Sequence, residues 1–304
     1  MSTAAPSLGA AITLLRPKQW IKNLFVFAPL IFARELFLWE PVTLTLRAFA
    51  AFCITASAVY IINDMVDLDA DRAHPRKRFR PLAARTISTR GAFLLLGLLL
   101  LTDVCVVWGM TDKFIMILCA YFFMNLAYTF KLKEIFLLDI FIIAAGFMLR
   151  VLAGAYAISV HVSSWIILCT LFLSLFLGFA KRRAEIMAMQ AAGAASERKV
   201  LQHYRVGVLD QMLTITAAGT VIAYALYTVA PRTIEVFRTD RLIYTTVFVM
   251  YGIFRYMHLI HTTESVENPA AVVTSDFPII ANVVLWISAC VVLIYFEGRL
   301  PFFR

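Results

Sequence analysis

Residues 51–71 read AFCITASAVYIINDMVDLDAD, an apolar run that ends in a cluster of aspartates. The run extends back to Val42, and a helix needs about 20 mostly apolar residues to cross the hydrocarbon core of a bilayer. The stretch from Val42 to Ile62 therefore predicts a membrane-spanning helix that carries carboxylates beyond its end. The whole chain shares this character, since 62% of its 304 residues are hydrophobic and 15% are charged. This composition excludes an ordinary water-soluble globular protein.

About nine apolar segments are candidate membrane spans. They are 24–39, 42–62, 91–111, 114–130, 135–158, 162–180, 212–230, 242–259 and 278–296. The first is the weakest because Arg34 and Glu35 interrupt it, and a count of eight spans is the alternative. Asp276 is predicted as the N-cap of the last span. We predict an all-α polytopic membrane protein with about nine transmembrane helices, in which residues 1–304 form a single integral membrane catalytic domain.

The basic residues favour one side of the predicted membrane. Most of the 28 Lys and Arg residues fall on the side of the N-terminus, and the positive-inside rule makes that side cytoplasmic. The connections 64–90 and 181–211 lie on the same side and are far longer than a helix–helix connection needs. We therefore expect these two loops to cap an active site that faces the cytoplasm. The net charge of +9 fits this topology and anionic substrates, and we predict no nucleic-acid partner.

The aspartates that follow the second predicted span form the sharpest functional pattern. With α-helical periodicity, Asp64, Asp67 and Asp71 fall within about 60° of one another. Asn63 lies beside them, whereas Asp69 points away. Three carboxylates on one face repel one another, so a divalent cation is needed to neutralise them. Hard oxygen ligands of this kind suit Mg²⁺ that is held jointly with substrate phosphates, so the pattern predicts a magnesium site.

Basic residues follow the aspartates directly. Arg72, Arg76 and Arg80 lie in a segment that Pro75 and Pro81 prevent from continuing as a simple helix. Acid followed by base is the pattern expected of a metal–diphosphate site, because the basic groups contact phosphate oxygens that the metal leaves uncovered. The positive-inside rule alone would also place basic residues here, so topology is the alternative explanation.

Other charged residues border or interrupt the predicted spans. Lys18 and Lys22 are one helical turn apart near the N-terminus and predict a shared basic face. Asp139 and Arg150 fall inside the fifth span, where charges are costly and by default functional. A structural ion pair between them is the alternative. The remaining candidates border the fourth span or follow the sixth: Tyr128, Lys133, Lys181, Arg182, Arg183 and Tyr204.

Three motifs of the chain resemble those of the UbiA-type superfamily of intramembrane prenyltransferases. They are Asn63-Asp64-x-x-Asp67-x-x-x-Asp71, Arg80-Pro81-Leu82 and Tyr128-Thr-Phe-Lys131-Leu-Lys133. The resemblance implies a helical bundle around a central cavity that opens to the cytoplasm, where Mg²⁺ and an allylic diphosphate bind. The second acidic motif of the aromatic prenyltransferases is absent from the sequence, and Lys181-Arg182-Arg183-Ala184-Glu185 stands in its place.

This departure makes the chain similar to one branch, the decaprenyl-phosphate phosphoribosyltransferases, and segments 15–23, 71–75 and 138–154 carry the same resemblance. The branch implies Mg²⁺-dependent transfer of 5-phosphoribose from phosphoribosyl diphosphate (PRPP) to decaprenyl phosphate or another polyprenyl phosphate, for arabinan precursors of the cell envelope. It also implies a bacterial inner (plasma) membrane and allows a homo-oligomer. Two phosphorylated substrates bring more negative charge than one prenyl diphosphate. The replacement of an acidic segment by a basic one is therefore the change expected for such substrates.

Within this hypothesis, Asp64, Asp67 and Asp71 hold Mg²⁺ and the diphosphate of the sugar donor. Lys22 and Lys133 are the other predicted catalytic residues, as candidates to meet the substrate phosphates. The lipid phosphate is already an anion, so its attack on the ribosyl carbon needs no general base. The remaining candidates bind the substrate phosphates or the ribose hydroxyls: Lys18, Asn63, Arg72, Arg76, Arg80, Tyr128, Arg150, Lys181, Arg182, Arg183 and Tyr204.

Two other functions remain open at this point. A UbiA-type prenyltransferase would move a polyprenyl group from its diphosphate to an aromatic acceptor and would use the same first acidic motif. The missing second acidic motif argues against it. A transporter or lipid flippase would be expected to show inverted repeats and spans interrupted by Gly or Pro near the membrane midplane. Neither feature is evident in the sequence.

Overall fold

The computed structural model describes residues 8–74, 77–192, 199–262 and 275–296. Over these ranges the chain is helical and contains no β-strand, which confirms the all-α prediction. Eight of the described helices are long and apolar enough to cross a membrane. They are α3 (Trp39–Val66), α5 (Thr89–Val107), α6 (Asp112–Phe130), α7 (Leu138–Ala157), α8 (Ser164–Ala192), α9 (Val206–Val229), α11 (Thr246–Thr262, extended at its start by the 3₁₀ helix η5, Arg241–Thr245) and α13 (Phe277–Tyr295). The shorter α-helices of the described residues are α1 (Leu8–Leu15), α2 (Ala28–Phe32), α4 (Leu68–Ala73) and α10 (Pro231–Phe237).

The segment predicted as the first span, 24–39, does not form a helix of spanning length. It contains the end of η1, a 3₁₀ helix over Pro17–Phe27, and α2, which covers only Ala28–Phe32. Five α-helical residues rise about 7.5 Å, far less than the thickness of a bilayer. A turn follows in which Arg34 has a left-handed φ of 63°. Among the described residues the count is therefore eight, so the predicted count of nine is not confirmed.

The predicted loop 181–211 begins later than expected, because α8 continues to Ala192. Two ion pairs within the helix support this extension beyond the apolar stretch. Lys181 lies 3.9 Å from Glu185, and Arg182 lies 2.5 Å from the same carboxylate. The part of the loop that follows contains the short 3₁₀ helix η4 (Lys199–His203).

The predicted loop 64–90 is also partly helical. Its first residues complete α3, and α4 (Leu68–Ala73) and the 3₁₀ turn η2 (Lys77–Phe79) follow. The candidate residue Arg76 lies outside the described residues. The loop ends at Ser88, whose side chain accepts a hydrogen bond from the backbone N–H of Gly91 and so caps α5.

The chain divides into two compact units. The first consists of Met1–Lys133 and Leu149–His161, and the second of Glu134–Met148 and Val162–Arg304. Helix α7 contributes residues to both units.

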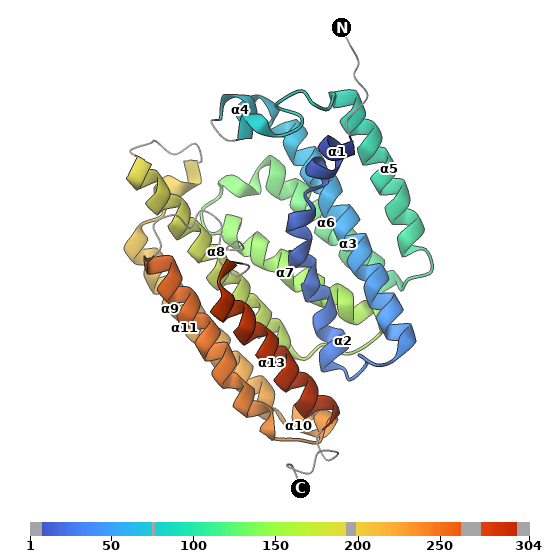
Figure 1. Ribbon diagram of the computed structural model, residues 1–304, viewed down its shortest axis with the longest axis vertical. Helices are drawn as coiled ribbons and strands as arrows, with labels where there is room; N and C mark the ends of the chain where they lie inside the picture. The colour runs from blue at the N-terminus through green and yellow to red at the C-terminus, as the bar shows by residue number, and fades with distance from the viewer. Residues whose placement is uncertain (1–7, 75–76, 193–198, 263–274, 297–304) are drawn as a thin grey trace. The chain divides into compact units, whose positions relative to one another are not determined.

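In the first unit, α3 is the central helix and packs against η1, α5 and α6 (Figure 1). Ala48 and Ala51 of α3 are completely buried, and small residues of this kind let neighbouring helices approach closely. Phe52, on the same helix, packs against Phe114 and Tyr121 of α6, with ring centroids 6.4 and 5.0 Å apart. The buried residues of α3 continue along the helix to Asp64 in its last turn.

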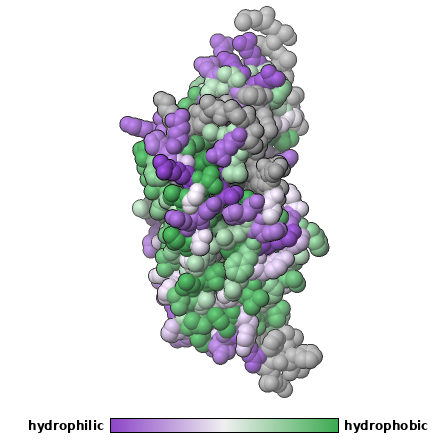
Figure 2. All heavy atoms as spheres, turned by 90° about the vertical axis from the view of Figure 1, so that its left-hand side faces the viewer, coloured by the Kyte–Doolittle hydropathy of each residue, from purple (hydrophilic) through white to green (hydrophobic). Residues whose placement is uncertain are grey.

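In the second unit, α8 and α9 pack most extensively against each other. Gly219 of α9 lies against Phe172 of α8, where an added Cβ would come within 2.7 Å of the ring. Phe176 of α8 packs on Tyr256 of α11, with ring centroids 5.4 Å apart. Figure 2 shows apolar side chains over much of one face of the molecule, as expected of helices that face lipid.

Candidate active site

The predicted carboxylates lie at the end of α3 and in α4. Asp64 is in the last turn of α3, Asp67 is its C-cap, and Asp71 is in α4. The backbone N–H of Asp67 donates to the Asn63 carbonyl at 2.9 Å, and that of Asp71 donates to the Asp67 carbonyl at 2.8 Å. Helical spacing is therefore kept across the junction of the two helices. Asp64 and Asp71 are buried, whereas the side chain of Asp69 is 95% exposed and points away as predicted.

Two arginines pair with the buried carboxylates. Arg80, in the bend that follows η2, donates from a single nitrogen, Nη1, to Asp71 Oδ2 at 2.6 Å and to Asp64 Oδ1 at 3.2 Å. Arg16, between α1 and η1, also donates to Asp64 Oδ1. Because one guanidinium nitrogen contacts both carboxylates, Asp64 and Asp71 lie close together.

Lys133 pairs with the third carboxylate. It lies in the 3₁₀ turn η3 (Leu132–Glu134) that follows α6, and its Nζ donates to Asp67 Oδ1 at 2.9 Å. Lys133 was predicted from sequence as a catalytic residue, and the structure places its Nζ at Asp67. The three cations thus come from connections between helices, whereas the carboxylates lie in the last turn of α3, at its junction with α4 and in α4.

The cations are more exposed than the two innermost carboxylates. The side chains of Arg16, Arg80 and Lys133 are 24%, 27% and 20% exposed, whereas those of Asp64 and Asp71 are 2% and 4% exposed. The cations therefore present donors to solvent above the carboxylates. Such donors match the oxygens of phosphate groups, which bind guanidinium and ammonium groups by charge-assisted hydrogen bonds.

The donor chemistry of these aspartates fits a magnesium ion. Asp64, Asp67 and Asp71 offer hard carboxylate oxygens of the kind that Mg²⁺ prefers, and the Arg80 nitrogen shows that two of them can meet one cationic atom. Within the part of the chain that the structure describes, no three His, Cys, Asp or Glu side chains form a ready-made metal site. The aspartates are paired with basic side chains instead.

The second predicted basic group lies on η1, and its geometry differs from the prediction. In a 3₁₀ helix, residues four positions apart are rotated by about 120°, so Lys18 and Lys22 do not share a face. Lys18 is exposed and Lys22 is half-buried. The predicted shared basic face is therefore wrong, because it assumed an α-helix.

Arg150 is bonded to η1 and α6. It is 6% exposed, and it donates from Nε to Asn23 Oδ1 at 2.7 Å and from Nη2 to the Tyr121 hydroxyl at 2.8 Å. One turn further along α7, a Cβ on Gly154 would lie 2.0 Å from the carbonyl oxygen of Val26. Arg150 and Gly154 therefore hold η1 against α7. Sequence reasoning did not identify Asn23 or Tyr121 as partners.

In the second unit, Asp139 forms a buried network with Arg182 and Tyr204. Arg182 Nε donates to Asp139 Oδ2 at 2.6 Å, and both side chains are completely buried. The Tyr204 hydroxyl donates to Asp139 Oδ1 at 2.6 Å and accepts from the Leu137 N–H at 3.0 Å. Burial and the neighbouring Asp139 carboxylate raise the pKa of Tyr204, so the phenol stays protonated. The network joins the start of α7, α8 and the segment that follows η4.

Arg183 and Lys181 occupy different surroundings. Arg183 Nε donates to Asp210 Oδ1 of α9 at 2.7 Å, and its Nη1 donates to the Ile260 carbonyl of α11 at 2.9 Å. Arg183 thus ties three helices together and satisfies a carbonyl in the last turn of α11. The Lys181 side chain is 40% exposed, and its Nζ lies 3.9 Å from Glu185 Oε1.

The remaining predicted residues lie on or near α3, α4 and α6. Asn63 and Tyr128 are half-buried on α3 and α6. Arg72 is exposed and pairs with Asp69 at 3.1 Å.

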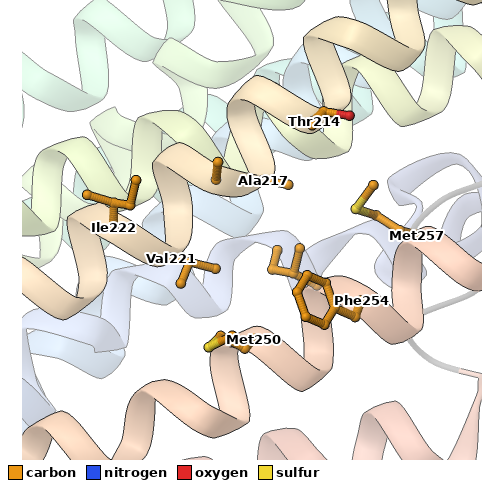
Figure 3. A pocket seen from close by; sticks show the side chains of 9 residues that line it. Thr214, Ala217, Val221, Ile222, Met250, Phe254 and Met257 are labelled. Carbon is orange, nitrogen blue, oxygen red and sulfur yellow. The ribbon is translucent and has the colours of Figure 1, made fainter.

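A groove in the second unit is apolar and does not suit this chemistry. It has a volume of about 320 Å³ and lies between α9 and α11. Figure 3 shows Val221 and Ile222 of α9 on one side and Met250, Phe254 and Met257 of α11 on the other. Its lining offers no charged group, so the polar cluster around Asp64 remains the candidate site.

The chain is similar to known proteins over most of its length. Residues 24–286 match the model of the UbiA prenyltransferase family. The decaprenyl-phosphate phosphoribosyltransferase of Mycolicibacterium smegmatis is 38% identical over 232 residues, which cover 74% of this chain and 73% of that protein. The protein of the same name from Mycobacterium tuberculosis is 34% identical over 225 residues, covering 72% and 74%.

Solved structures show the same fold. A UbiA homolog from Archaeoglobus fulgidus bound to GPP and Mg²⁺ aligns with a TM-score of 0.70 at 20% identity, over 94% of this chain and 99% of that one. A UbiA homolog from Aeropyrum pernix aligns with a TM-score of 0.65 at 16% identity, over 91% and 98%. From its match to the family model, its relatives and its fold, this chain belongs to the UbiA prenyltransferase family.

Proposed function

We propose that this protein is a membrane-embedded transferase that moves 5-phosphoribose from PRPP to decaprenyl phosphate or a similar polyprenyl phosphate. Relatives that carry the name decaprenyl-phosphate phosphoribosyltransferase at 34–38% identity support this activity. The structural observation that carries the proposal is the pair of buried carboxylates, Asp64 and Asp71, beneath partly exposed basic side chains. This arrangement suits a substrate that presents phosphate oxygens together with a divalent metal ion.

Asp64, Asp67 and Asp71 would hold Mg²⁺ at this site. When bound, the ion would neutralise the diphosphate oxygens of PRPP and stabilise the charge of the leaving group. A related UbiA homolog has been solved with Mg²⁺ and GPP, which supports a divalent metal in this family.

Basic side chains of the chain complete the site around the leaving group. Arg80 and Lys133 would donate to diphosphate oxygens, because both already lie at the carboxylates and reach solvent. In the reaction, the bond between ribosyl C1 and the diphosphate oxygen breaks and its electron pair stays with the diphosphate. Lys22 and Lys18, on η1, are proposed to counter further substrate phosphate charge.

The acceptor is the phosphate of the polyprenyl lipid. One of its oxygens forms the new bond to C1, and because that oxygen is already anionic no side chain has to remove a proton. The residues assigned to substrate binding in the second unit, Lys181, Arg182, Arg183 and Tyr204, stay predictions. So do the single catalytic domain, the two capping loops, and the substrate-binding roles of Asn63, Arg72, Arg76, Tyr128 and Arg150.

We also propose a bacterial inner-membrane location with the N-terminus and the site on the cytoplasmic side. The distribution of Lys and Arg supports this orientation. PRPP is a soluble, highly charged donor, and a site at the end of α3 would meet it at the membrane surface.

A transfer assay tests the activity. Purified protein in detergent is given labelled PRPP, decaprenyl phosphate and Mg²⁺, and the lipid fraction is counted with and without a chelator. We expect chelator-sensitive labelled lipid, and about 100-fold or greater loss of turnover in Asp64→Asn and Asp71→Asn. Asp69→Asn is the matched control, because this exposed aspartate points away from the cluster, and it should keep its activity.

Two results would contradict the proposal. One is unchanged turnover in both Asp64→Asn and Asp71→Asn, which would remove the metal site. The other is the absence of labelled lipid while a polyprenyl diphosphate is consumed with an aromatic acceptor, which would make the protein a prenyltransferase.

A further inference from the structure

Arg16 has an aromatic support that neither the motifs nor the relatives assign. Its guanidinium carbon lies 4.9 Å from the centroid of the Tyr60 ring, over the face of that ring. The same guanidinium donates to Asp64. A cation that rests on an aromatic face is attracted by the ring's electron-rich surface. Arg16 is therefore fixed from two sides, by a ring and by a carboxylate.

Tyr60 lies on the same face of α3 as the aspartates at its end. It precedes Asp64 by four residues and Asp67 by seven, which is the spacing of one helical face. Tyr60 is half-buried on α3. Within the described part of the chain its hydroxyl makes no hydrogen bond, so the ring is the part of Tyr60 that contacts Arg16.

The backbone at Arg16 is also unusual. Arg16 adopts a left-handed conformation, with φ 54° and ψ 55°, and Pro17 follows it. Residues other than glycine disfavour this region, and a following proline restricts the residue before it to extended conformations. Unfavourable backbone geometry of this kind is often found at functional sites. Arg16 has this geometry directly before η1, and its side chain reaches Asp64.

The Arg16 guanidinium has unused donors. An arginine offers five N–H groups in a planar fork, and among the described residues only Nη2 is bonded, to Asp64. The side chain is 24% exposed, so its other N–H groups can reach a ligand at the carboxylate cluster. Arg80 contacts the same Asp64 oxygen, so Asp64 keeps a counter-charge when Arg16 turns toward a phosphate.

We propose that Arg16 binds the diphosphate of the donor and that Tyr60 is the positioning residue that orients it. This inference rests on the proposed function for the identity of the donor. Arg16 donates to a diphosphate oxygen, and the Tyr60 ring holds the guanidinium plane so that its fork faces the ligand. The pair adds a third cation to those that Arg80 and Lys133 supply.

The test measures binding of inorganic diphosphate with Mg²⁺ to the full chain in detergent, by calorimetric titration. Arg16→Gln should weaken binding about tenfold or more, because a hydrogen bond to a charged group is lost. Tyr60→Leu should weaken it about fivefold, and Tyr60→Phe, which keeps the ring, should stay within about twofold. Tyr60→Leu added to Arg16→Gln should cause no further loss, since the ring acts through Arg16.

Two matched controls lie elsewhere in the same unit. Arg47→Gln removes the same charge from the other end of α3, where Arg47 donates to the Val106 carbonyl at 2.9 Å. Tyr156→Leu removes a ring that lies 5.7 Å from the Lys113 ammonium. Neither variant should change diphosphate affinity.

Unchanged affinity in Arg16→Gln would overturn the proposal, and this result decides it even where Tyr60→Leu does not fold. Equal losses in Tyr60→Phe and Tyr60→Leu, or additive losses in the double variant, would overturn the positioning role of the ring. The transfer assay separates this inference from the proposed function. If the wild-type protein binds diphosphate with these variant effects but transfers no phosphoribose, the proposed donor is wrong and the diphosphate site stands.

Discussion

Arg182 provides a direct test of the buried network in the second unit. Its side chain is completely buried, and it donates to Asp139 at 2.6 Å and to Glu185 at 2.5 Å. Replacing Arg182 with Leu removes the cation and leaves the Asp139 carboxylate buried. Breaking a buried ion pair in this way costs about 3–5 kcal/mol. We expect a loss of unfolding free energy near the lower end, about 3 kcal/mol, because the Tyr204 hydroxyl still donates to Asp139.

Unfolding in mixed micelles, titrated with a denaturing detergent and followed by circular dichroism, measures this loss. The double variant Asp139→Leu/Arg182→Leu should lie within about 1 kcal/mol of the wild type, because both charges are then gone. The difference from additivity gives the coupling energy of the pair. Lys181→Leu is the matched control, since this neighbouring cation is 40% exposed and 3.9 Å from Glu185, and it should change stability by less than about 0.5 kcal/mol.

The reasoning would be refuted by a loss below about 1 kcal/mol in Arg182→Leu. It would also be refuted if the double variant lost as much stability as the single one, since the two charges would then not be coupled. A variant of Arg182 with full stability and a weakened affinity for PRPP would instead make Arg182 a ligand, as the sequence analysis proposed.

Two further predictions concern packing and pH. Gly154→Ala should destabilise the first unit by about 1–3 kcal/mol, because the new Cβ would lie 2.0 Å from the Val26 carbonyl oxygen. Gly207→Ala should leave stability unchanged, because its new Cβ meets no atom within 4 Å. The thermal unfolding midpoints of the two variants measure the difference. The hydrogen bond from Arg255 lowers the pKa of Asp276, so the folded state holds its proton less tightly than the unfolded state. This contribution to stability is present above the ordinary pKa of Asp, about 4, and is lost as pH falls through the lowered value. The thermal midpoint of Asp276→Asn should therefore fall less than that of the wild type between pH 7 and pH 3, and an equal fall would contradict the assignment.

Much of the fold could be predicted from hydropathy, because a spanning helix needs a long apolar run. The predicted cap of the last span is also confirmed, since the Ile279 N–H donates to Asp276 Oδ1 at 3.0 Å. Hydropathy failed where charge decides the local structure. It counted 24–39 as a span although the backbone turns at Arg34. It ended the sixth span at Ala180, whereas ion pairs to Glu185 accompany the continuation of α8.

The carboxylate cluster was predictable because its spacing is local. Asp64 and Asp71 keep the helical spacing that the sequence shows, and Lys133 is the last residue of a recognisable motif. Long-range partners leave no such trace, since Arg150 and Asn23 are 127 positions apart in sequence. The suggested ion pair between Asp139 and Arg150 is wrong, because the two residues are too far apart along α7. Eleven residues of α-helix rise about 16 Å, too far for an ion pair along one helix.

The separation of acids and bases between helices and connections bears on how such a site can diversify. Asp64 belongs to the central helix α3, Asp67 caps that helix and Asp71 lies in the short helix that follows, so the carboxylates are tied to the fold. Arg16, Arg80 and Lys133 lie in connecting segments, where substitutions disturb less packing. Substitutions in these segments can therefore change the positive charge that a substrate meets, while the three aspartates are inherited unchanged. A single ancestral scaffold could in this way give rise to enzymes for donors of different ionic character.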